Sequence, residues 1–215
     1  ALFDVCHTLV KITTITDFVD YFLSSKPKHF LRKKILYLFF KFLKKIRLIR
    51  SKRYKKHLVS LFSGYSEKEV LKVAKDYVSF RLKNFLKEEI FQRLKELKKN
   101  GYQVILLSAG LDIYLKEFSD FLDVDLVCTV LEKNKEGYFT GKILGLDCLG
   151  KNKVLKLKEI LSFKEVDWQE SVAFGDNFSD LPFLSLVKKP ILVDPDKKLE
   201  KWAKEKGWEI IKTKK

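Results

Sequence analysis

"LFDVCHTLV" (residues 2–10) ends a short apolar run in an aspartate, Asp4, with a threonine, Thr8, four residues further on. A short, continuous apolar run is typical of a strand that is buried on both faces of a parallel sheet. In such sheets the ligand site lies beyond the carboxyl ends of the strands. The stretch therefore predicts a buried strand that carries Asp4 into a functional site.

Apolar runs alternate with helical patterns through much of the chain, mostly after residue 88. Residues 88–110 ("EEIFQRLKELKKNGYQVILLSAG") predict a helix, a turn at Gly101 and a strand. Further elements are predicted as strands at 124–130, 171–174, 190–195 and 208–212, a hairpin around Gly137, and helices at 152–163 and 197–207. Strands that alternate with helices predict an α/β fold with a Rossmann-like, doubly wound parallel sheet.

Residues 13–87 differ, because they show little strand signal and a long helical periodicity. We interpret them as a helical cap domain, inserted into a core domain that comprises residues 1–12 and 88–215. Within the stretch 29–49, one helical face collects the apolar residues Leu31, Ile35, Leu38, Phe39, Phe42, Ile46 and Ile49. A helix this apolar must pack against protein on both flanks or contact lipid.

The 215-residue chain has a formal net charge of +16, and much of this charge is concentrated in the predicted cap. Fourteen Lys and Arg residues, and no Asp or Glu, lie between Lys26 and Lys56. A basic segment of this kind indicates an anionic partner, such as a phosphate group, a membrane surface or nucleic acid. A solvated helix face explains it equally well.

The cysteines and the apolar runs bear on the cellular setting. Cys6, Cys128 and Cys148 are too few and too scattered for a disulfide framework, so we expect a reducing, cytoplasmic setting. The first residues lack the pattern of a signal peptide, and no apolar run reaches the ~18 residues that a membrane-spanning helix needs.

Polar side chains capable of phosphoryl chemistry follow several predicted strands or begin a helix. They are Asp4, Ser108, Lys153, Asp176 and Asp180. Because the ends of parallel strands converge on one crevice, we expect these residues to share a site. Taken singly, each has a structural explanation as a strand-end residue, a helix cap or a surface lysine. Taken together, their order and placement favour phosphoryl transfer.

Each of these residues suits one part of that reaction. A carboxylate such as Asp4 can attack phosphorus, and Mg²⁺ prefers carboxylate oxygens, which Asp4 and Asp176 would supply. Ser108 would donate a hydrogen bond to a phosphoryl oxygen, and Lys153 would add a fixed positive charge. We expect Gly175 to let the backbone turn tightly before Asp176.

These segments resemble the motifs of the haloacid dehalogenase superfamily, in its phosphoserine-phosphatase-like branch (subfamily IB). D-x-D-x-T matches residues 4–8 with one departure, the second motif matches Ser108, the third matches Lys153, and G-D-x-x-x-D matches residues 175–180. The tail "PILVDPDKKLEKWAKEKGWEII" (190–211) is also similar to this branch. The resemblance covers 1–12 and 88–215, whereas the insert matches only by its position as a cap.

The resemblance implies a Rossmann-like core with a helical C1-type cap, and Mg²⁺-dependent hydrolysis of a small phosphorylated substrate through a phospho-aspartate on Asp4. It implies that Mg²⁺ is held by Asp4, Asp176 and the backbone carbonyl of Cys6, with Asp180 supporting the metal site. The residues expected to contact substrate are Thr8, Ser108, Ala109, Lys153 and Asn177.

The departure from the family pattern is at Cys6, where the family has an aspartate that protonates the leaving alkoxide and then activates water. A free thiol, with a pKa of about 8.5, is a poor substitute for a carboxyl group. Loss of general acid–base help costs roughly 10²–10⁴ in rate. We therefore expect a slow enzyme, an enzyme for substrates with good leaving groups such as aryl or acyl phosphates, or a protein that binds phosphorylated ligands without turnover. His7 is a less favoured substitute base.

The basic cap supports further hypotheses about partners. Its cations could steer anionic substrates, and the wide apolar face beside them indicates a phospholipid headgroup or an anionic membrane surface. The alternative is a cap packed on the core with solvated lysines. Nucleic-acid binding is disfavoured, because it would use Tyr37, Phe40 and Tyr54 as stacking residues and the apolar periodicity explains Phe40 better. The oligomeric state is left open.

Overall fold

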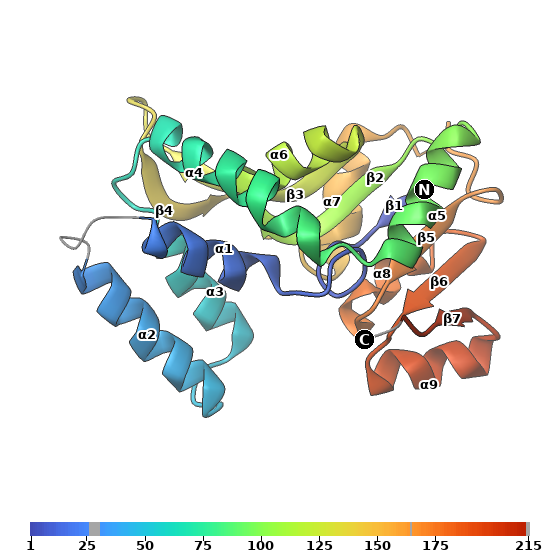
Figure 1. Ribbon diagram of the computed structural model, residues 1–215. Helices are drawn as coiled ribbons and strands as arrows, with labels where there is room; N and C mark the ends of the chain where they lie inside the picture. Colours follow the sequence, from blue (N-terminus) through green and yellow to red (C-terminus); the bar gives the residue numbers. More distant parts are fainter. Residues whose placement is uncertain (26–30, 164, 214–215) are drawn as a thin grey trace.

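The computed structural model describes residues 1–25, 31–163 and 165–213, so that Lys26, Lys28 and His29 of the basic segment lie outside the described residues. Among the described residues, seven strands form a sheet in the order β4-β3-β2-β1-β5-β6-β7 (Figure 1). The strands β3 and β4 are antiparallel, and the other neighbours are parallel. The strands are β1 (Leu2–Phe3), β2 (Ile105–Leu111), β3 (Asp125–Lys133), β4 (Phe139–Leu144), β5 (Val172–Gly175), β6 (Lys189–Val193) and β7 (Glu209–Ile211).

Helices cover both faces of this sheet. One face carries α5 (Glu88–Lys99) and α6 (Asp112–Leu122), joined by α1 (Thr14–Ser24) and α4 (Glu67–Phe80), and the other carries α7 (Lys151–Ile160), α8 (Leu181–Leu184) and α9 (Lys197–Lys206). Neighbouring residues of a strand point to opposite faces, so Phe3 of β1 packs in the first core with Phe174, and Leu2 packs in the second with Ala173. This arrangement confirms the predicted α/β, doubly wound sheet.

The local predictions in the core hold at the level of elements. The hairpin around Gly137 is present as β3 and β4, and Gly137 occupies the left-handed region with a φ of 80°. The two predicted helices at 152–163 and 197–207 are α7 and α9. The Asp196 carboxylate caps α9 by accepting hydrogen bonds from the first turn, and Gly207 ends the helix with a φ of 67°.

The inserted helices leave and rejoin the core through a short antiparallel neck, formed by residues 9–11 and 85–87. The Lys11 N–H donates to the Phe85 carbonyl and the Lys87 N–H donates to the Leu9 carbonyl, both at 2.9 Å. Between these two points lie α1, α2 (Leu31–Lys45), α3 (Ser51–Ser60) and α4. The neck lies within a few residues of the predicted ends of the insert, 13 and 87, and the division into a core domain and a cap domain stays a prediction.

The insert does not have a separate apolar core. Phe18 of α1 contacts Tyr114 of the core helix α6, with ring centroids 4.8 Å apart, and Tyr77 of α4 contacts both rings at 5.1 and 5.8 Å. All three side chains belong to the same buried cluster as the strand residue Phe3. The helices α1 and α4 therefore pack as part of the core, whereas α2 and α3 lie further out (Figure 1).

Most of the apolar face predicted for residues 29–49 points away from the protein, whereas Ile49, which follows α2, packs against the buried cluster. Six exposed side chains at the surface of α2 and the turn after it are Leu31, Ile35, Leu38, Phe39, Phe42 and Ile46, which we call the α2 outer face. Tyr37, on the opposite side, is the buried residue of this helix. Packing on both flanks is therefore wrong for the described residues. None of the described helices combines the length and apolar character that a membrane span requires.

The aromatic residues considered for nucleic-acid stacking are used inside the insert. Tyr37 and Tyr54 are buried, and Phe40 is half-buried and stacks on the His57 ring with centroids 3.4 Å apart. These rings hold α2 against α3, so they are not presented for base stacking.

Candidate active site

Three neighbouring strands bring the predicted polar residues to one edge of the sheet. Asp4 follows β1, Ser108 lies in β2, and Asp176 follows β5. Phe3 of β1 is in register with Leu106 of β2 and Phe174 of β5, which sets the three side chains at a similar height. The parallel register is thus the physical reason why these residues, far apart in sequence, line the same cavity.

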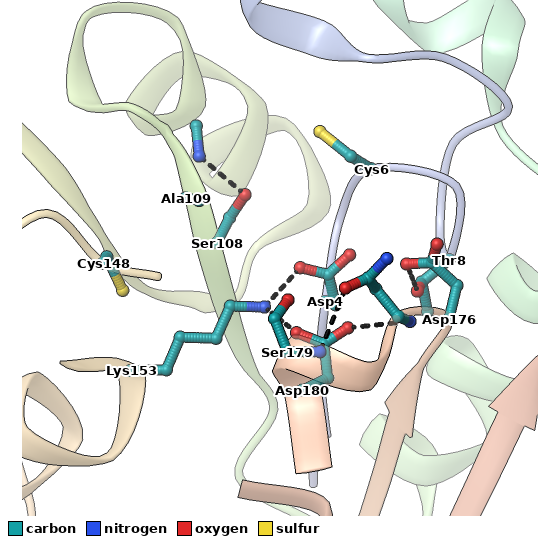
Figure 2. A network of polar contacts seen from close by, with 12 residues as sticks. Asp4, Cys6, Thr8, Ser108, Ala109, Cys148, Lys153, Asp176, Ser179 and Asp180 are labelled. Atoms are coloured by element: carbon teal, nitrogen blue, oxygen red, sulfur yellow. Dashed lines mark hydrogen bonds and ion pairs between the residues drawn. The ribbon is translucent and has the colours of Figure 1, made fainter. Parts of the chain in front are cut away.

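Lys153 reaches this edge from the first turn of α7 and is almost completely buried. Its ammonium group donates to Asp4 Oδ1 at 2.5 Å and to Asp180 Oδ1 at 2.7 Å (Figure 2). Although burial alone lowers it, the two carboxylates raise the pKa of Lys153 above its ordinary value. Lys153 therefore keeps its positive charge beside Asp4.

Asp176 and Asp180 complete a cluster with Asp4, in which one oxygen from each carboxylate lies within 4.8 Å of the others. The Thr8 hydroxyl donates to Asp176 Oδ1 at 3.1 Å, and the Asn177 N–H donates to Asp180 Oδ2 at 3.2 Å. We call Asp4, Asp176, Asp180 and Lys153 the carboxylate cluster. Thr8 is buried and acts on Asp176.

The charges of the carboxylate cluster fit a divalent metal ion. Burial raises the pKa of Asp4 to about 6, and burial together with the charges of Asp4 and Asp180 raises the pKa of Asp176 to about 8. Three carboxylates face one ammonium group, so a further cation would relieve their repulsion. Carboxylate oxygens are the ligands that Mg²⁺ prefers, and Asp4 and Asp176 are placed to hold such an ion.

Gly175 acts through its missing side chain. Its backbone does not adopt a left-handed conformation; instead, a Cβ atom at this position would lie 3.1 Å from the Asp180 Cβ and 3.2 Å from Asp180 Oδ2. The glycine therefore leaves room for Asp180 to turn back under the strand end. The expected tight turn is replaced by a close approach of two segments.

Ser108 and Ala109 line the cavity beside Asp4. The Ser108 hydroxyl accepts a hydrogen bond from the Gly110 N–H at 3.0 Å, which orients its own hydrogen for donation to a ligand. The Ala109 carbonyl accepts from Lys55, at 2.5 Å. Asn177 also lines the cavity, and its side chain accepts from the Ser179 N–H at 3.0 Å. Direct contact of these residues with a substrate stays a prediction.

Lys55, on α3, is a cavity residue that sequence reasoning missed. Its ammonium group also donates to Thr129 Oγ1 at 3.1 Å and forms an ion pair with Asp147. It thus links the outer helices to the core beside Ser108. Its place among the many cations of the basic segment gave no signal, because spacing along α3 does not reveal which lysine faces the core.

Cys6 is held by hydrogen bonds to Thr14 at the start of α1. The Thr14 N–H donates to the sulfur at 3.4 Å, and the Thr14 hydroxyl lies 3.2 Å from it and 2.8 Å from the Tyr114 hydroxyl. Burial, followed by the charge of Asp4, raises the pKa of the thiol to about 11. Figure 2 shows the sulfur pointing away from the carboxylates. Cys6 is therefore a neutral thiol at this position.

His7, the next residue after Cys6, has a left-handed backbone conformation with a φ of 62°. Its Nε2 atom lies 2.9 Å from the Thr13 hydroxyl, and its carbonyl accepts from the Lys87 ammonium group at 2.5 Å. Lys87 is buried and also pairs with Asp194 at 2.8 Å. Lys87 thus fixes the loop that carries Asp4 and Cys6, which is a positioning role that sequence reasoning missed.

The cavity above the cluster is about 940 Å³ in volume and extends from Asp4 to the outer helices. Its wall includes Phe42 and Lys45 of the α2 region, and Leu149 on the core side. A space of this size is near the upper end of the range of roughly 300–1,000 Å³ that is usual for small-molecule sites.

The sequence model of one protein family, the haloacid dehalogenase-like hydrolases, matches residues 1–185 of this chain. This range includes every member of the carboxylate cluster. The chain belongs to this family. The family resemblance seen in the motifs is thereby confirmed, as is the hydrolase class.

Curated relatives of this haloacid dehalogenase-like hydrolase include phosphatases. A histidinol-phosphatase of Neisseria meningitidis serogroup C (strain 8013) is 26% identical over 159 residues, which cover 72% of this chain and 71% of the relative. A phosphoserine phosphatase of Methanocaldococcus jannaschii is 28% identical over 108 residues, covering 47% and 51% of the two chains. These relatives support the predicted phosphatase class.

Solved structures share the fold. A protein of unknown function from Bordetella pertussis Tohama I aligns with a TM-score of 0.82 at 20% identity, over 98% of this chain and 96% of that one. A phospho-aspartyl intermediate analogue of phosphoserine phosphatase aligns with a TM-score of 0.65 at 21% identity, over 100% and 92%. Both alignments extend over the inserted helices as well as the sheet.

Proposed function

We propose that this haloacid dehalogenase-like hydrolase is a Mg²⁺-dependent phosphatase that hydrolyses phosphomonoesters through a phospho-aspartate on Asp4. The observation that carries the proposal is the buried ion pair of Asp4 and Lys153 at the floor of the cavity, next to Asp176 and Asp180. A nucleophile, a fixed cation and ligands for a metal ion meet there. The matched phosphatases act on small phosphorylated compounds, which supports the same substrate class here.

The first step is attack of an Asp4 carboxylate oxygen on phosphorus. The new bond is Asp4 O–P, the bond that breaks is between phosphorus and the ester oxygen, and the electron pair leaves on that oxygen. Water then attacks phosphorus, which releases inorganic phosphate and restores the Asp4 carboxylate. When bound to Asp4, Asp176 and the Cys6 carbonyl, Mg²⁺ would offset the negative charge of the phosphoryl oxygens.

Lys153 and Ser108 hold the phosphoryl group in this proposal. The Lys153 ammonium group contacts Asp4 and so also lies beside the phosphorus that Asp4 attacks. The Ser108 hydroxyl, oriented by Gly110, donates to a phosphoryl oxygen. Asp180 holds Lys153 from the other side and supports the metal site. These fixed charges need no rearrangement as the transition state forms.

With Cys6 at this position, a thiol rather than a carboxylic acid would have to protonate the leaving oxygen and activate the attacking water. A neutral thiol can give a proton to a strongly basic leaving oxygen, but it is a poor base for the water that attacks the phospho-aspartate. We therefore expect slow turnover of alkyl phosphates and better turnover of aryl or acyl phosphates. The second candidate function, binding of phosphorylated ligands without turnover, is favoured by the same thiol.

The proposal is tested first by replacing the nucleophile. Asp4→Asn is expected to reduce Mg²⁺-dependent hydrolysis of p-nitrophenyl phosphate by about 10⁴-fold or to background, because the attacking oxygen is lost. Asp120→Asn, at an exposed position on α6, is the matched control and is expected to keep full activity. Equal activity of Asp4→Asn and wild type would refute the mechanism.

The second test addresses the proton carrier. Cys6→Asp is expected to raise turnover of alkyl phosphates by roughly 10²-fold or more, because a carboxyl group can act as both acid and base. Cys6→Asn has a similar shape without the acid and is expected to give no gain. If both variants behave like wild type while folding and hydrolysis of aryl phosphates persist, position 6 is not the missing acid.

A further inference from the structure

The α2 outer face is a continuous row of exposed apolar side chains. Its six members are each between 46% and 59% exposed. At 100° per residue, Leu31, Ile35, Leu38, Phe39 and Phe42 fall on one side of the helix. A row of this kind marks a surface that is covered in the working protein, whereas isolated exposed apolar residues are ordinary.

The orientation of α2 is fixed by polar contacts on its inner side. Lys33 donates to the Leu61 carbonyl at 2.9 Å and to the Ser63 carbonyl at 2.6 Å, and Lys41 pairs with Asp20 at 2.7 Å. These contacts hold the charged side of the helix toward the protein. Rotation of α2 to bury its apolar side would break all of them, so the outward row is built into the packing.

The charge around this face identifies what covers it. Arg32 and Lys34 are exposed on the flanks of the row, and Lys45 is exposed at its end. The whole segment 26–56 has fourteen cations and no acidic residue, so two copies that met through this face would repel each other. An anionic bilayer matches it, because apolar side chains enter the acyl boundary while flanking Lys and Arg contact lipid phosphates.

The α2 outer face meets the cavity of the candidate active site at one residue. Phe42 belongs to the α2 outer face and also lines the cavity that contains Asp4. Across the cavity, the exposed Leu149 provides a second apolar side chain on the core side. A molecule that occupies the cavity therefore meets charge at the floor and apolar side chains near the bilayer-facing helix.

We infer that the α2 outer face docks this protein on an anionic lipid bilayer, and that the cavity takes phosphomonoesters carried by membrane lipids. The second part rests on the proposed function, whereas docking does not require any chemistry. The phosphate of such a lipid reaches Asp4 at the floor of the cavity, and Lys44 and Lys45 of α2 line the cavity on the side of the bilayer-facing helix. The lipid chains stay near Phe42 and the bilayer.

Docking is tested by sedimentation of the full chain with vesicles. Binding is expected to vesicles of phosphatidylcholine and phosphatidylglycerol in equal amounts, to be weak to phosphatidylcholine alone, and to weaken at high salt. The double variant Leu38→Ser/Phe39→Ser is expected to bind about tenfold or more weakly, because two apolar anchors are lost. Circular dichroism confirms that the variant is folded.

Substitutions of the same kind at other surface positions serve as controls for the apolar and the charge variants. Phe80→Ser and Phe121→Ser alter exposed phenylalanines on α4 and at α6, and are expected to bind vesicles as wild type does. Arg32→Glu/Lys34→Glu is expected to lose binding, whereas Lys197→Glu/Lys201→Glu on α9 is expected to keep it. Wild-type binding by the Leu38→Ser/Phe39→Ser variant overturns docking. Self-association through this face without vesicle binding also overturns it.

The substrate class is tested with phosphatidate in the same vesicles. Wild type is expected to release inorganic phosphate, and Leu38→Ser/Phe39→Ser to release at least tenfold less while hydrolysing soluble p-nitrophenyl phosphate unchanged. Vesicle binding without release from phosphatidate, with p-nitrophenyl phosphate hydrolysed, overturns the lipid substrate and leaves the proposed function standing. Hydrolysis of neither substrate, with vesicle binding intact, overturns the proposed function and leaves docking standing.

Discussion

The carboxylate cluster and the α2 outer face distribute polar and apolar groups in opposite ways. In the cluster, charged side chains at the sheet edge are withdrawn from water and paired, with Lys153 between Asp4 and Asp180. On α2, apolar side chains face outward while Lys33 and Lys41 point inward. Each arrangement costs free energy unless a ligand or a surface completes it. Phe42 of the α2 outer face lines the same cavity as the carboxylate cluster, which is why we propose one function for the two regions.

The largest expected effect concerns the cluster. Lys153→Met keeps the length of the side chain but leaves Asp4 and Asp180 buried without their cation. We expect roughly 3–5 kcal/mol lower free energy of unfolding and a loss of activity of about 10²–10³-fold or more. Urea denaturation and phosphatase kinetics measure the two effects. Lys116→Met, at an exposed position on α6, serves as the control, and equal unfolding of the two variants would contradict the role of the pair.

Two phenylalanine substitutions compare how much buried and outward-facing apolar side chains contribute to the free energy of unfolding. Phe18→Ala removes a ring that joins α1, α4 and α6, and is expected to lower the free energy of unfolding by roughly 3–5 kcal/mol. Phe39→Ala, on the α2 outer face, is expected to change it by about 0.5 kcal/mol or less. Thermal and urea unfolding provide the measurement. A large loss in Phe39→Ala would show that α2 packs on its outer side.

A loss smaller than those of Lys153→Met and Phe18→Ala is expected from the support of Cys6. Thr14→Val removes the hydroxyl between Cys6 and Tyr114, and is expected to cost about 1–3 kcal/mol because the Tyr114 hydroxyl loses a partner. Tyr114→Phe and the double variant complete a cycle measured by urea denaturation. Coupled, non-additive effects are expected. Additive costs would mean that the two hydroxyls do not interact in solution.

The sequence allowed the sheet and the cluster to be predicted, because both depend on local signals. Buried strands are short apolar runs, and the residues at their ends meet for any chain with this parallel order. Asp4, Ser108, Asp176 and Asp180 are predictable on this basis, and Lys153 is predictable as a residue that begins a helix after a strand. The departure at Cys6 follows from the family motif instead, and the hydrogen bonds of Cys6 to Thr14 could not be predicted, because they join two segments through a turn.

The direction of α2 and the role of Lys55 could not be predicted. Periodicity identifies a helical face, but it does not say whether that face points to the core, and here the charged Lys33 lies on the inner side. The same limit hides Lys55 among many cations. The role of Gly175 was also misread, since the need for space beside Asp180 arises from tertiary contact.

The antiparallel neck has a consequence for how such a protein can change over evolution. Its two backbone hydrogen bonds, between Lys11 and Phe85 and between Lys87 and Leu9, hold the ends of the inserted segment side by side. A segment of different length can begin and end at this junction without shifting the register of the sheet if it keeps the core contacts of α1 and α4, because closing a longer loop costs little additional entropy. Recognition elements can therefore be exchanged while the nucleophile stays in place.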